Sequence, residues 1–298
     1  MDIALAPVSV PCSFGSVQAE LILEPSVEML FHLLGDALIF VESNSFSIAV
    51  KFFNWTATYL FSSDVIFKYG LFYLSAKEAE LKGFKFVDFH IDESALTKKK
   101  SGVFGLISNC NTSSKRELAI KELSKYMNVT VGGKCALDIK DKDICPLGSN
   151  CAEIYGQYPF YFAVENSVCK DYVTEKYWDR TSVPSIPIVM RRKIYESSNM
   201  PPHSFIAMDD YDSPRAMAEH LIKLETDKKA YAEYFKWRRG IWTAAPWNAP
   251  GYRNGFCRLC ERLWEEDPQE KVIDDVWAWF DAESQCEKDE FVKAWVRN

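Results

Sequence analysis

Apolar and polar positions alternate by segment between residues 103 and 214. Short runs that are almost wholly apolar are separated by longer stretches of polar or amphipathic sequence. Because these runs are too short for helices and rich in aromatic and β-branched residues, they predict buried strands. The strands expected on this basis lie at residues 103–107, 160–164, 185–190 and 205–208. Strands that alternate with helices in this way are typical of a doubly wound α/β domain.

Residues 159–178 read PFYFAVENSVCKDYVTEKYW and combine a strand, a polar turn and a helix. The apolar run stops at residues 165–167, and Asp171 is the expected N-cap of the helix. The turn would lie at the carboxyl end of a parallel strand, where open α/β sheets bind ligands. Glu175 and Lys176 would then offer a carboxylate to ribose hydroxyls and an ammonium to phosphate oxygens. The alternative interpretation is a capped helix that carries surface charges.

A second helix is expected at residues 114–127, after the strand at 103–107 and a polar loop at 108–113. Its start, Ser114-x-x-Glu117, matches a capping box. Lys115 and Arg116 would lie in the first turn, where the helix dipole disfavours cations by roughly 0.3–1 kcal/mol. An anionic group is therefore expected opposite them. The alternative for Arg116 is a surface side chain whose stem covers the helix.

Residues before 97 predict a smaller α/β region. One βαβ unit is expected from a strand at 19–23, a helix at 25–34 and a strand at 37–41, followed by aromatic-rich strands at 52–59 and 65–69. The charged, non-periodic residues 96–101 are interpreted as a linker, with the run Lys98-Lys99-Lys100 solvated. Later helices are expected at 228–239 and 272–280, the second packing back toward the first domain.

Composition and charge exclude some classes of partner. The chain has 298 residues, enough for two modest domains, and 48% of them are hydrophobic. Its net charge of -7 and pI near 5.3 argue against a nucleic-acid partner, whose phosphates require a basic face. No apolar stretch reaches the ~18–20 residues of a membrane span. Residues 1–10 lack the basic start of a signal peptide.

Nine cysteines are many for a cytosolic enzyme, and we interpret them as partly disulfide-bonded. Zinc is the competing explanation for Cys257-x-x-Cys260. A structural zinc site needs a second pair or nearby histidines, and none of the four histidines is close in sequence. The sequons at Asn54, Asn111 and Asn128 fit a secretory route but are weak evidence.

The run Asp210-Tyr211-Asp212 looks like the metal-binding D-x-D of some glycosyltransferases. It stands directly before Ser213-Pro214, a good helix start with proline at the first position. Carboxylates at a helix N-terminus act as caps, so we do not expect a metal site there.

Several ordered blocks resemble the α1,3-fucosyltransferases, an inverting family that uses GDP-fucose and has a GT-B fold. The central block is 159–178, which resembles the family's donor-binding signature. The others are FNWTATYLFSSDVIFKYG at 53–70, LISNCNTSSKREL at 106–118, GGKC at 132–135, PPHSFIAMDDYDSP at 201–214 and CRLC at 257–260. The resemblance implies an α/β protein with two Rossmann-like domains facing a cleft, the N-terminal one shortened.

The resemblance also implies roles for individual residues. Arg116 stands at the position of the arginine that grips the donor pyrophosphate, and Lys176 would stabilise the same leaving group. Glu42, at the end of the strand 37–41, resembles the family's general base. The remaining donor-binding candidates are Ser108, Asn109, Tyr161, Asn166 and Glu175.

The expected organisation is an acceptor-side domain at 1–97, a GDP-fucose-binding domain at 98–245 and a C-terminal segment at 246–298. The expected reaction is transfer of L-fucose from GDP-fucose to GlcNAc of a glycan, with inversion and without a required cofactor, a divalent cation being at most stimulatory. The cysteine pattern is similar to invertebrate members that act on the innermost GlcNAc of glycoprotein N-glycans. The resemblance also implies a location in the Golgi lumen, where an N-terminal anchor that this chain lacks holds family members to the membrane.

Two other functions remain open from the sequence. One is a homologue that binds a GDP-sugar but transfers it weakly or not at all, because its N-terminal domain is shortened. The other is an unrelated nucleotide-binding enzyme, which the lack of any G-x-G-x-x-G or G-x-x-x-x-G-K motif disfavours.

Overall fold

The computed structural model divides the chain into two compact units. Unit 1 comprises Met1–Lys68 and Pro246–Glu283, and unit 2 comprises Tyr69–Ala245 and Ser284–Asn298. Residues 69–97 therefore group with unit 2, whereas the expected first boundary was at residue 97. The residues that the structure describes are 11–14, 17–20, 51, 53–87, 91, 93–97, 99–146, 149–246, 249, 251–252, 255–263 and 271–298.

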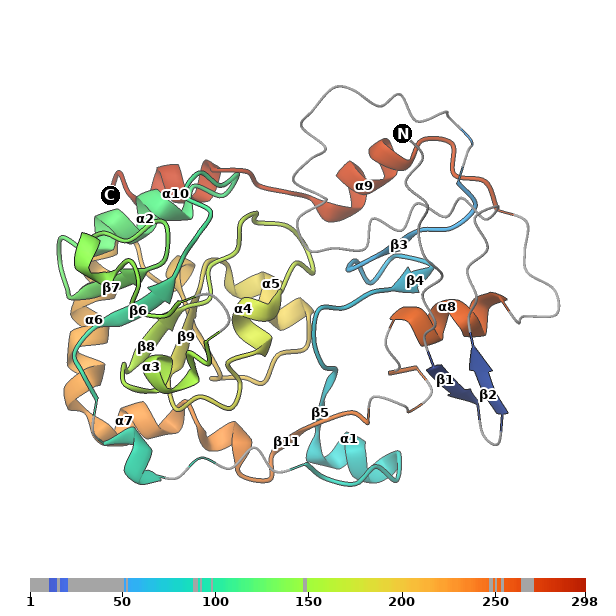
Figure 1. The fold of residues 1–298 in the computed structure, drawn as a ribbon, viewed down its shortest axis with the longest axis horizontal. Helices are drawn as coiled ribbons and strands as arrows, with labels where there is room; N and C mark the ends of the chain where they lie inside the picture. Colours follow the sequence, from blue (N-terminus) through green and yellow to red (C-terminus); the bar gives the residue numbers. More distant parts are fainter. Residues whose placement is uncertain are drawn as a thin grey trace. The chain divides into compact units, whose positions relative to one another are not determined.

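Unit 2 is built on a five-stranded sheet in which every pairing is parallel (Figure 1). The strand order is β10-β9-β8-β6-β7. In chain order the strands are β6 (Val103–Leu106), β7 (Val129–Gly132), β8 (Phe160–Phe162), β9 (Ile186–Val189) and β10 (Ile206–Ala207). The four strands expected from apolar runs are confirmed, and with them the α/β fold class.

The apolar runs form strands because the sheet is covered on both faces. Phe104, Phe160 and Ile188 are completely buried, and Ile206 is 1% exposed. Strands buried on both faces read as continuous apolar runs rather than as alternating ones. Around the sheet lie α2 (Arg116–Leu123), α3 (Ala152–Gly156), α4 (Glu175–Trp178), α5 (Arg192–Ser197), α6 (Pro214–Thr226), α7 (Lys228–Glu233) and α10 (Glu290–Trp295).

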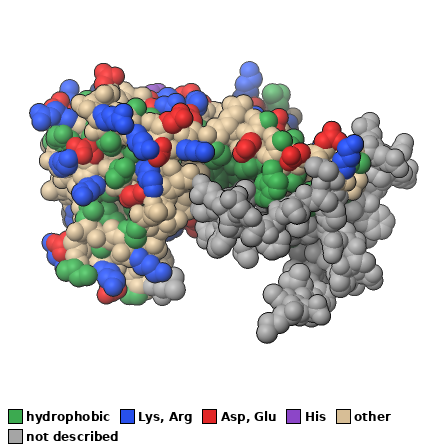
Figure 2. Space-filling model, turned by 90° about the horizontal axis from the view of Figure 1, so that it is seen from above, with side chains coloured by type: hydrophobic (Ala, Val, Ile, Leu, Met, Phe, Trp, Pro, Cys, Tyr) green, Lys and Arg blue, Asp and Glu red, His purple; other side chains and the backbone are tan. Residues whose placement is uncertain are grey.

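The remaining elements of unit 2 flank this layer structure. A small antiparallel pair joins β5 (Tyr73–Ser75) to β11 (Trp242–Ala244), and α1 (Ala76–Leu81) follows β5 through a capping box on Ser75. Helices α2, α6 and α10 pack together beside the sheet (Figure 1). Lys and Arg side chains lie among Asp and Glu side chains over the face of unit 2 seen in Figure 2.

The described part of unit 1 contains short paired strands and two helices. A hairpin joins β1 (Pro11–Phe14) to β2 (Val17–Glu20), which overlaps the strand expected at 19–23. A parallel pair joins β3 (Ala57–Thr58) to β4 (Val65–Ile66), and α8 (Gly255–Leu263) and α9 (Val276–Ser284) follow late in the chain. The helix expected at 25–34 and the strand at 37–41 lie outside the described residues.

The capping box predicted after β6 is wrong. Helix α2 begins at residue 116, and its N-cap, Lys115, has a left-handed φ of 54° and makes no side-chain cap bond. The Ser114 hydroxyl instead donates to the carbonyl of Glu165 (2.8 Å). The Glu117 carboxylate accepts from the Thr112 hydroxyl (2.9 Å). Tertiary hydrogen bonds thus replace the local cap.

The N-cap predicted at Asp171 is also wrong. Asp171 has a left-handed φ of 61°, and α4 begins only at Glu175. The cap is Thr174, whose hydroxyl accepts from the backbone amide of Lys176. The prediction of Ser213 and Pro214 as the start of α6 is confirmed, because the Ser213 hydroxyl accepts from Ala216 (3.2 Å).

Three further expectations need correction. The helix predicted at 228–239 is two pieces, α7 and the 3-10 helix η5 (Lys236–Arg238). Asp210 does not cap a helix, because it forms an ion pair with Arg192 (2.5 Å). Lys99 is not solvated, because its ammonium donates to the carbonyls of Gly156 and Pro184, each at 2.5 Å.

The prediction of partial disulfide bonding is confirmed. Among the described residues, the bonds are Cys110–Cys135, Cys145–Cys151 and Cys169–Cys286. None of the helices in the described part of the chain is long and apolar enough to cross a membrane.

Candidate functional site

The strand order of unit 2 marks one place in the sheet. From β6 the chain moves to β7 at one edge, and it then returns past β6 to β8 on the other side. The loops after β6 and β8 therefore lead in opposite directions. In open α/β sheets, ligands bind outside the carboxyl ends of two such strands. The predicted donor-binding residues other than Tyr161 follow these two strands, so they gather at this switch point.

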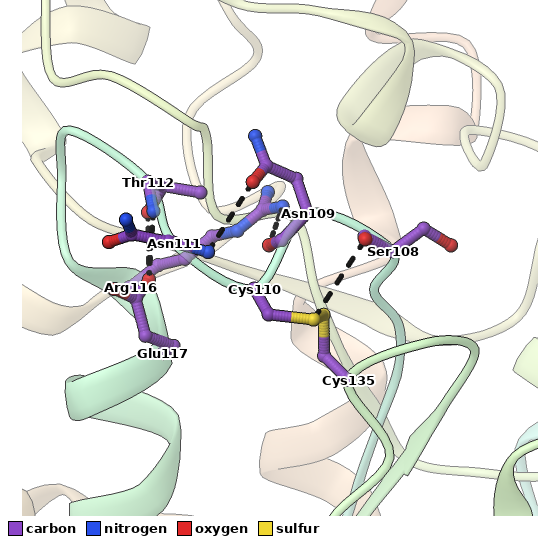
Figure 3. The surroundings of a disulfide bond; sticks show 8 residues. All are labelled: Ser108, Asn109, Cys110, Asn111, Thr112, Arg116, Glu117 and Cys135. Atoms are coloured by element: carbon purple, nitrogen blue, oxygen red, sulfur yellow. Dashed lines mark hydrogen bonds between the residues drawn. A yellow bond between two sulfur atoms is a disulfide. The ribbon is translucent and has the colours of Figure 1, made fainter.

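Arg116 lies at this switch point as a buried cation. Its side chain comes from the first position of α2, and the residue is 4% exposed. The guanidinium donates through Nη1 to the carbonyl of Val164 (2.8 Å) and through Nη2 to that of Asn109 (3.4 Å) (Figure 3). Its Nε is buried without a hydrogen-bond partner among the described residues. Burial lowers the pKa of Arg116, and nearby Glu165 opposes this shift. A buried guanidinium that is held by carbonyls retains its charge for an anion.

Glu165 lies next to Val164 and is the centre of a second group of contacts. Its carboxylate accepts from the amide and hydroxyl of Thr174 (both 2.8 Å) and pairs with the Lys176 ammonium at 3.1 Å. Burial raises the pKa of Glu165, with Lys176 opposing the rise. The turn thus holds Arg116 through the carbonyl of Val164 and Lys176 through the carboxylate of Glu165.

The Lys176 ammonium is saturated with acceptors. Besides Glu165, it contacts the Thr174 hydroxyl (2.9 Å) and the Glu175 carboxylate (3.0 Å). Burial alone would lower the pKa of Lys176, but Glu165 and Glu175 raise it above its ordinary value. The side chain of Glu165 is 6% exposed and that of Glu175 is 56% exposed. Glu175 is therefore the acceptor that an anionic ligand can replace.

Ser114 and Asn166 join the loops that follow β6 and β8. The amide of Ser114 donates to the carbonyl of Asn166 (2.9 Å), and the Ser114 hydroxyl bonds the preceding carbonyl. The side-chain Oδ1 of Asn166 is buried without a donor among the described residues. The site thus presents a free donor on Arg116 and a free acceptor on Asn166. A ligand that carries both anionic oxygens and hydroxyl groups would satisfy both.

The structure places the other predicted residues as follows. Ser108 and Asn109 lie exposed on the loop after β6, and the carbonyl of Asn109 contacts Arg116 (Figure 3). Tyr161 is 1% exposed and packs edge-on against Tyr155, so it lies in the core without surface for a nucleotide. Glu42 lies outside the described residues. The sequon residues, all exposed, are Asn54, Asn111 and Asn128.

Sequence reasoning missed Glu165 and Thr174, which position Lys176. The available signal was a carboxylate at the end of an apolar strand, followed by a threonine before the expected helix.

A cavity of about 140 Å³ lies elsewhere, at the amino ends of the strands, where Lys99, Ser101 and Pro159 are part of its lining. None of the predicted site residues lines it. In the described ranges, no cluster of His, Cys, Asp or Glu could hold a metal ion.

Comparison with known proteins gives consistent matches. A model of the C-terminal part of glycosyltransferase family 10 (fucosyltransferase) matches residues 96–279. The α-(1,3)-fucosyltransferase fut-1 of Caenorhabditis elegans is 36% identical over 213 residues, covering 67% of this chain and 46% of that protein. Glycoprotein 3-α-L-fucosyltransferase A of Drosophila melanogaster is 33% identical over 230 residues, covering 73% and 41%.

A crystal structure of an α1,3-fucosyltransferase with GDP is 26% identical, covers 47% of this chain and 38% of its own, and has a TM-score of 0.38. The chain spans about half the length of the curated relatives it matches. Because the family model covers more than half of the 298 residues, the chain belongs to glycosyltransferase family 10, the fucosyltransferases.

Proposed function

We propose that this chain is the donor-binding part of an α1,3-fucosyltransferase, and that unit 2 binds GDP-fucose at the switch point between β6 and β8. The observation that carries the proposal is the pair of cations, Arg116 and Lys176, held by consecutive residues of one turn. Two such cations would match the negative charges of a pyrophosphate. Among the relatives, fut-1 and fut-5 of Caenorhabditis elegans are named α-(1,3)-fucosyltransferases, which supports fucose as the sugar.

Transfer of fucose creates charge at both ends of the breaking bond. Positive charge grows on the sugar, as in glycoside hydrolysis, while negative charge grows on the departing GDP. Arg116 and Lys176 would stabilise that negative charge from a buried, preorganised position. A phosphate oxygen would replace Glu175 on Lys176, and the freed Glu175 carboxylate and the Asn166 Oδ1 would accept from sugar hydroxyls. Glu42 would take the proton of the attacking hydroxyl, with inversion at the anomeric carbon.

The acceptor is GlcNAc of a glycoprotein N-glycan in this proposal. The name of the Drosophila relative, a glycoprotein 3-α-L-fucosyltransferase, supports it. Three disulfides fit the oxidising lumen of the secretory route, and hence a Golgi location. The proposed reaction requires no metal, because Arg116 and Lys176 would balance the charge of the leaving group. Transfer should therefore persist in the presence of a chelator.

Calorimetric titration with GDP tests the donor site. Arg116→Ala and Lys176→Ala should each weaken binding by at least ~1.5 kcal/mol, the value of a hydrogen bond to a charged group. Lys121→Ala is the control, because this exposed lysine lies in the last turn of the same helix α2. Unchanged affinity in both site variants would remove the donor site from this turn.

A transfer assay separates the enzyme from a homologue that only binds. The chain, produced with and without an N-terminal extension taken from a relative, is incubated with GDP-fucose and a panel of GlcNAc-containing glycans. Fucosylated product supports the proposal. GDP binding without product in either form would favour the alternative, a GDP-sugar-binding homologue.

A further inference from the structure

We propose that the Cys110–Cys135 disulfide is a positioning crosslink for this site, so that opening it weakens nucleotide binding while the fold persists. The inference rests on the proposed function, because the nucleotide is the ligand whose affinity it concerns. It adds a redox dependence to the donor site.

The disulfide joins the loops that follow two neighbouring strands. Cys110 lies on the exposed loop after β6, and Cys135 follows β7, with their Cα atoms 5.4 Å apart (Figure 3). The ladder between the two strands ends just before the crosslink. Its last bonds run from the amide of Ile107 to the carbonyl of Gly132 (2.9 Å) and from the amide of Cys135 to the carbonyl of Ile107 (3.0 Å).

Beyond Ile107 the loop has little else to fix it. Residues 108–111 are exposed, and their hydrogen bonds in the described structure stay within residues 108–116. The amide of Asn111 contacts the side chain of Asn109 at 3.4 Å, but this contact lies within the loop and does not tie the loop to the rest of the unit. The disulfide is therefore the main restraint on the backbone of Asn109.

The position of Asn109 matters because its carbonyl is one of two acceptors of Arg116. The other acceptor, the carbonyl of Val164, follows the buried strand β8 and does not depend on the loop. If the disulfide opens, the guanidinium keeps its bond to Val164 and loses the restraint on its second side. Arg116 must then be ordered when the nucleotide binds. Loss of such preorganisation costs about tenfold in affinity.

The chain offers a matched control in the Cys145–Cys151 disulfide. This disulfide belongs to the same unit. The segment between its two cysteines contains none of the predicted site residues. Cys169–Cys286 is unsuitable, because Cys169 lies between Glu165 and Thr174. Opening the control disulfide tests the general effect of losing a crosslink on affinity.

The experiment compares dissociation constants for GDP by calorimetry. Cys110→Ser/Cys135→Ser should raise the Kd about tenfold while the circular dichroism spectrum and a cooperative melt are retained. Cys145→Ser/Cys151→Ser should leave the Kd within about twofold. In an Arg116→Ala background, Cys110→Ser/Cys135→Ser should cause little further loss, because the crosslink acts through Arg116. If the losses of affinity from Arg116→Ala and from Cys110→Ser/Cys135→Ser add, the crosslink does not act through Arg116.

Wild-type protein covers the case in which the serine pair does not fold. It is titrated with a thiol reductant, the opened cysteines are mapped by alkylation and mass spectrometry, and the GDP Kd is measured at each step. The Kd should rise with the opened fraction of Cys110–Cys135. A constant Kd while this disulfide opens would overturn the inference alone. Failure of untreated protein to bind GDP would overturn the proposed function as well.

Discussion

The two ends of the parallel sheet each hold a cation by backbone carbonyls, yet the two arrangements differ in what they leave free. At the carboxyl end, Arg116 is bound by Val164 and Asn109 and retains an unpaired Nε. At the amino end, Lys99 donates to Gly156 and Pro184. Burial lowers the pKa of Lys99 to about 8. A lysine can shed its charge and act as a structural clamp, whereas an arginine cannot.

The two ends of the sheet also differ in the carboxylates that accompany each cation. Among the described residues, the amino end has a cavity but no buried carboxylate that orients Lys99. The carboxyl end has Glu165, which is buried and orients Lys176, and Glu175, which is exposed and can be replaced. In the proposed function, the carboxyl end binds an anion because it combines a permanent charge with an exchangeable partner, and a cavity alone would not provide this.

The largest expected effect is on the buried carboxylate. Glu165→Gln should lower the free energy of unfolding by about 2 kcal/mol, because it breaks a buried ion pair while Lys176 retains Glu175. The control is Glu175→Gln, which removes the exposed partner of the same lysine and should cost less than about 1 kcal/mol. Urea unfolding measures both. Equal losses would mean that burial does not distinguish the two carboxylates.

The next effect concerns the identity of the cation. Arg116→Lys should weaken GDP binding by about tenfold, because a lysine lacks the planar fork that reaches two carbonyls and an anion together. Lys99→Met at the other end should leave GDP affinity within about twofold. Calorimetric titration of the two variants with GDP shows which end of the sheet binds the nucleotide. A loss confined to Lys99→Met would reverse the comparison.

The smallest effect is a pH dependence at Lys99. Its folded-state pKa of about 8 lies below the unfolded value of ~10.4. Between these values the unfolded chain binds more protons, so the stability contributed by Lys99 rises with pH. The melting temperature of wild type relative to Lys99→Met should therefore increase slightly from pH 7 to pH 9. A flat difference would show that the ammonium is not desolvated.

Sequence patterns predicted four of the five strands of this sheet, because parallel strands that are buried on both faces read as apolar runs such as 103–107. They missed the edge strand β7, in which Val129 and Thr130 are only partly buried. The patterns identified the start of α6 but failed at the starts of α2 and α4. Ser114 looks like a cap, but its hydroxyl is drawn to the carbonyl of Glu165, and Thr174 caps α4 because its own hydroxyl is fixed by Glu165. These bonds join residues far apart in sequence, which local propensity cannot foresee.

The sequence predicted the cations of the candidate site. It did not predict the buried carboxylate and the disulfide that position them. Arg116 stood out because a cation in the first turn of a helix needs an anion, and the motif marked Lys176. Glu165 looked like part of a surface turn, and its burial depends on Thr174 and Lys176. The pairing of Cys110 could not be deduced, because cysteine spacing does not determine disulfide connectivity.

Hydrogen exchange with and without GDP, read by mass spectrometry, tests the central claim that the nucleotide binds at the carboxyl end of the sheet. A ligand that binds only the folded state slows exchange where it rigidifies the backbone. The account predicts added protection in residues 107–116 and 164–176, and no change in 96–101 or 225–231 at the amino end. Protection confined to the amino-end segments would contradict it.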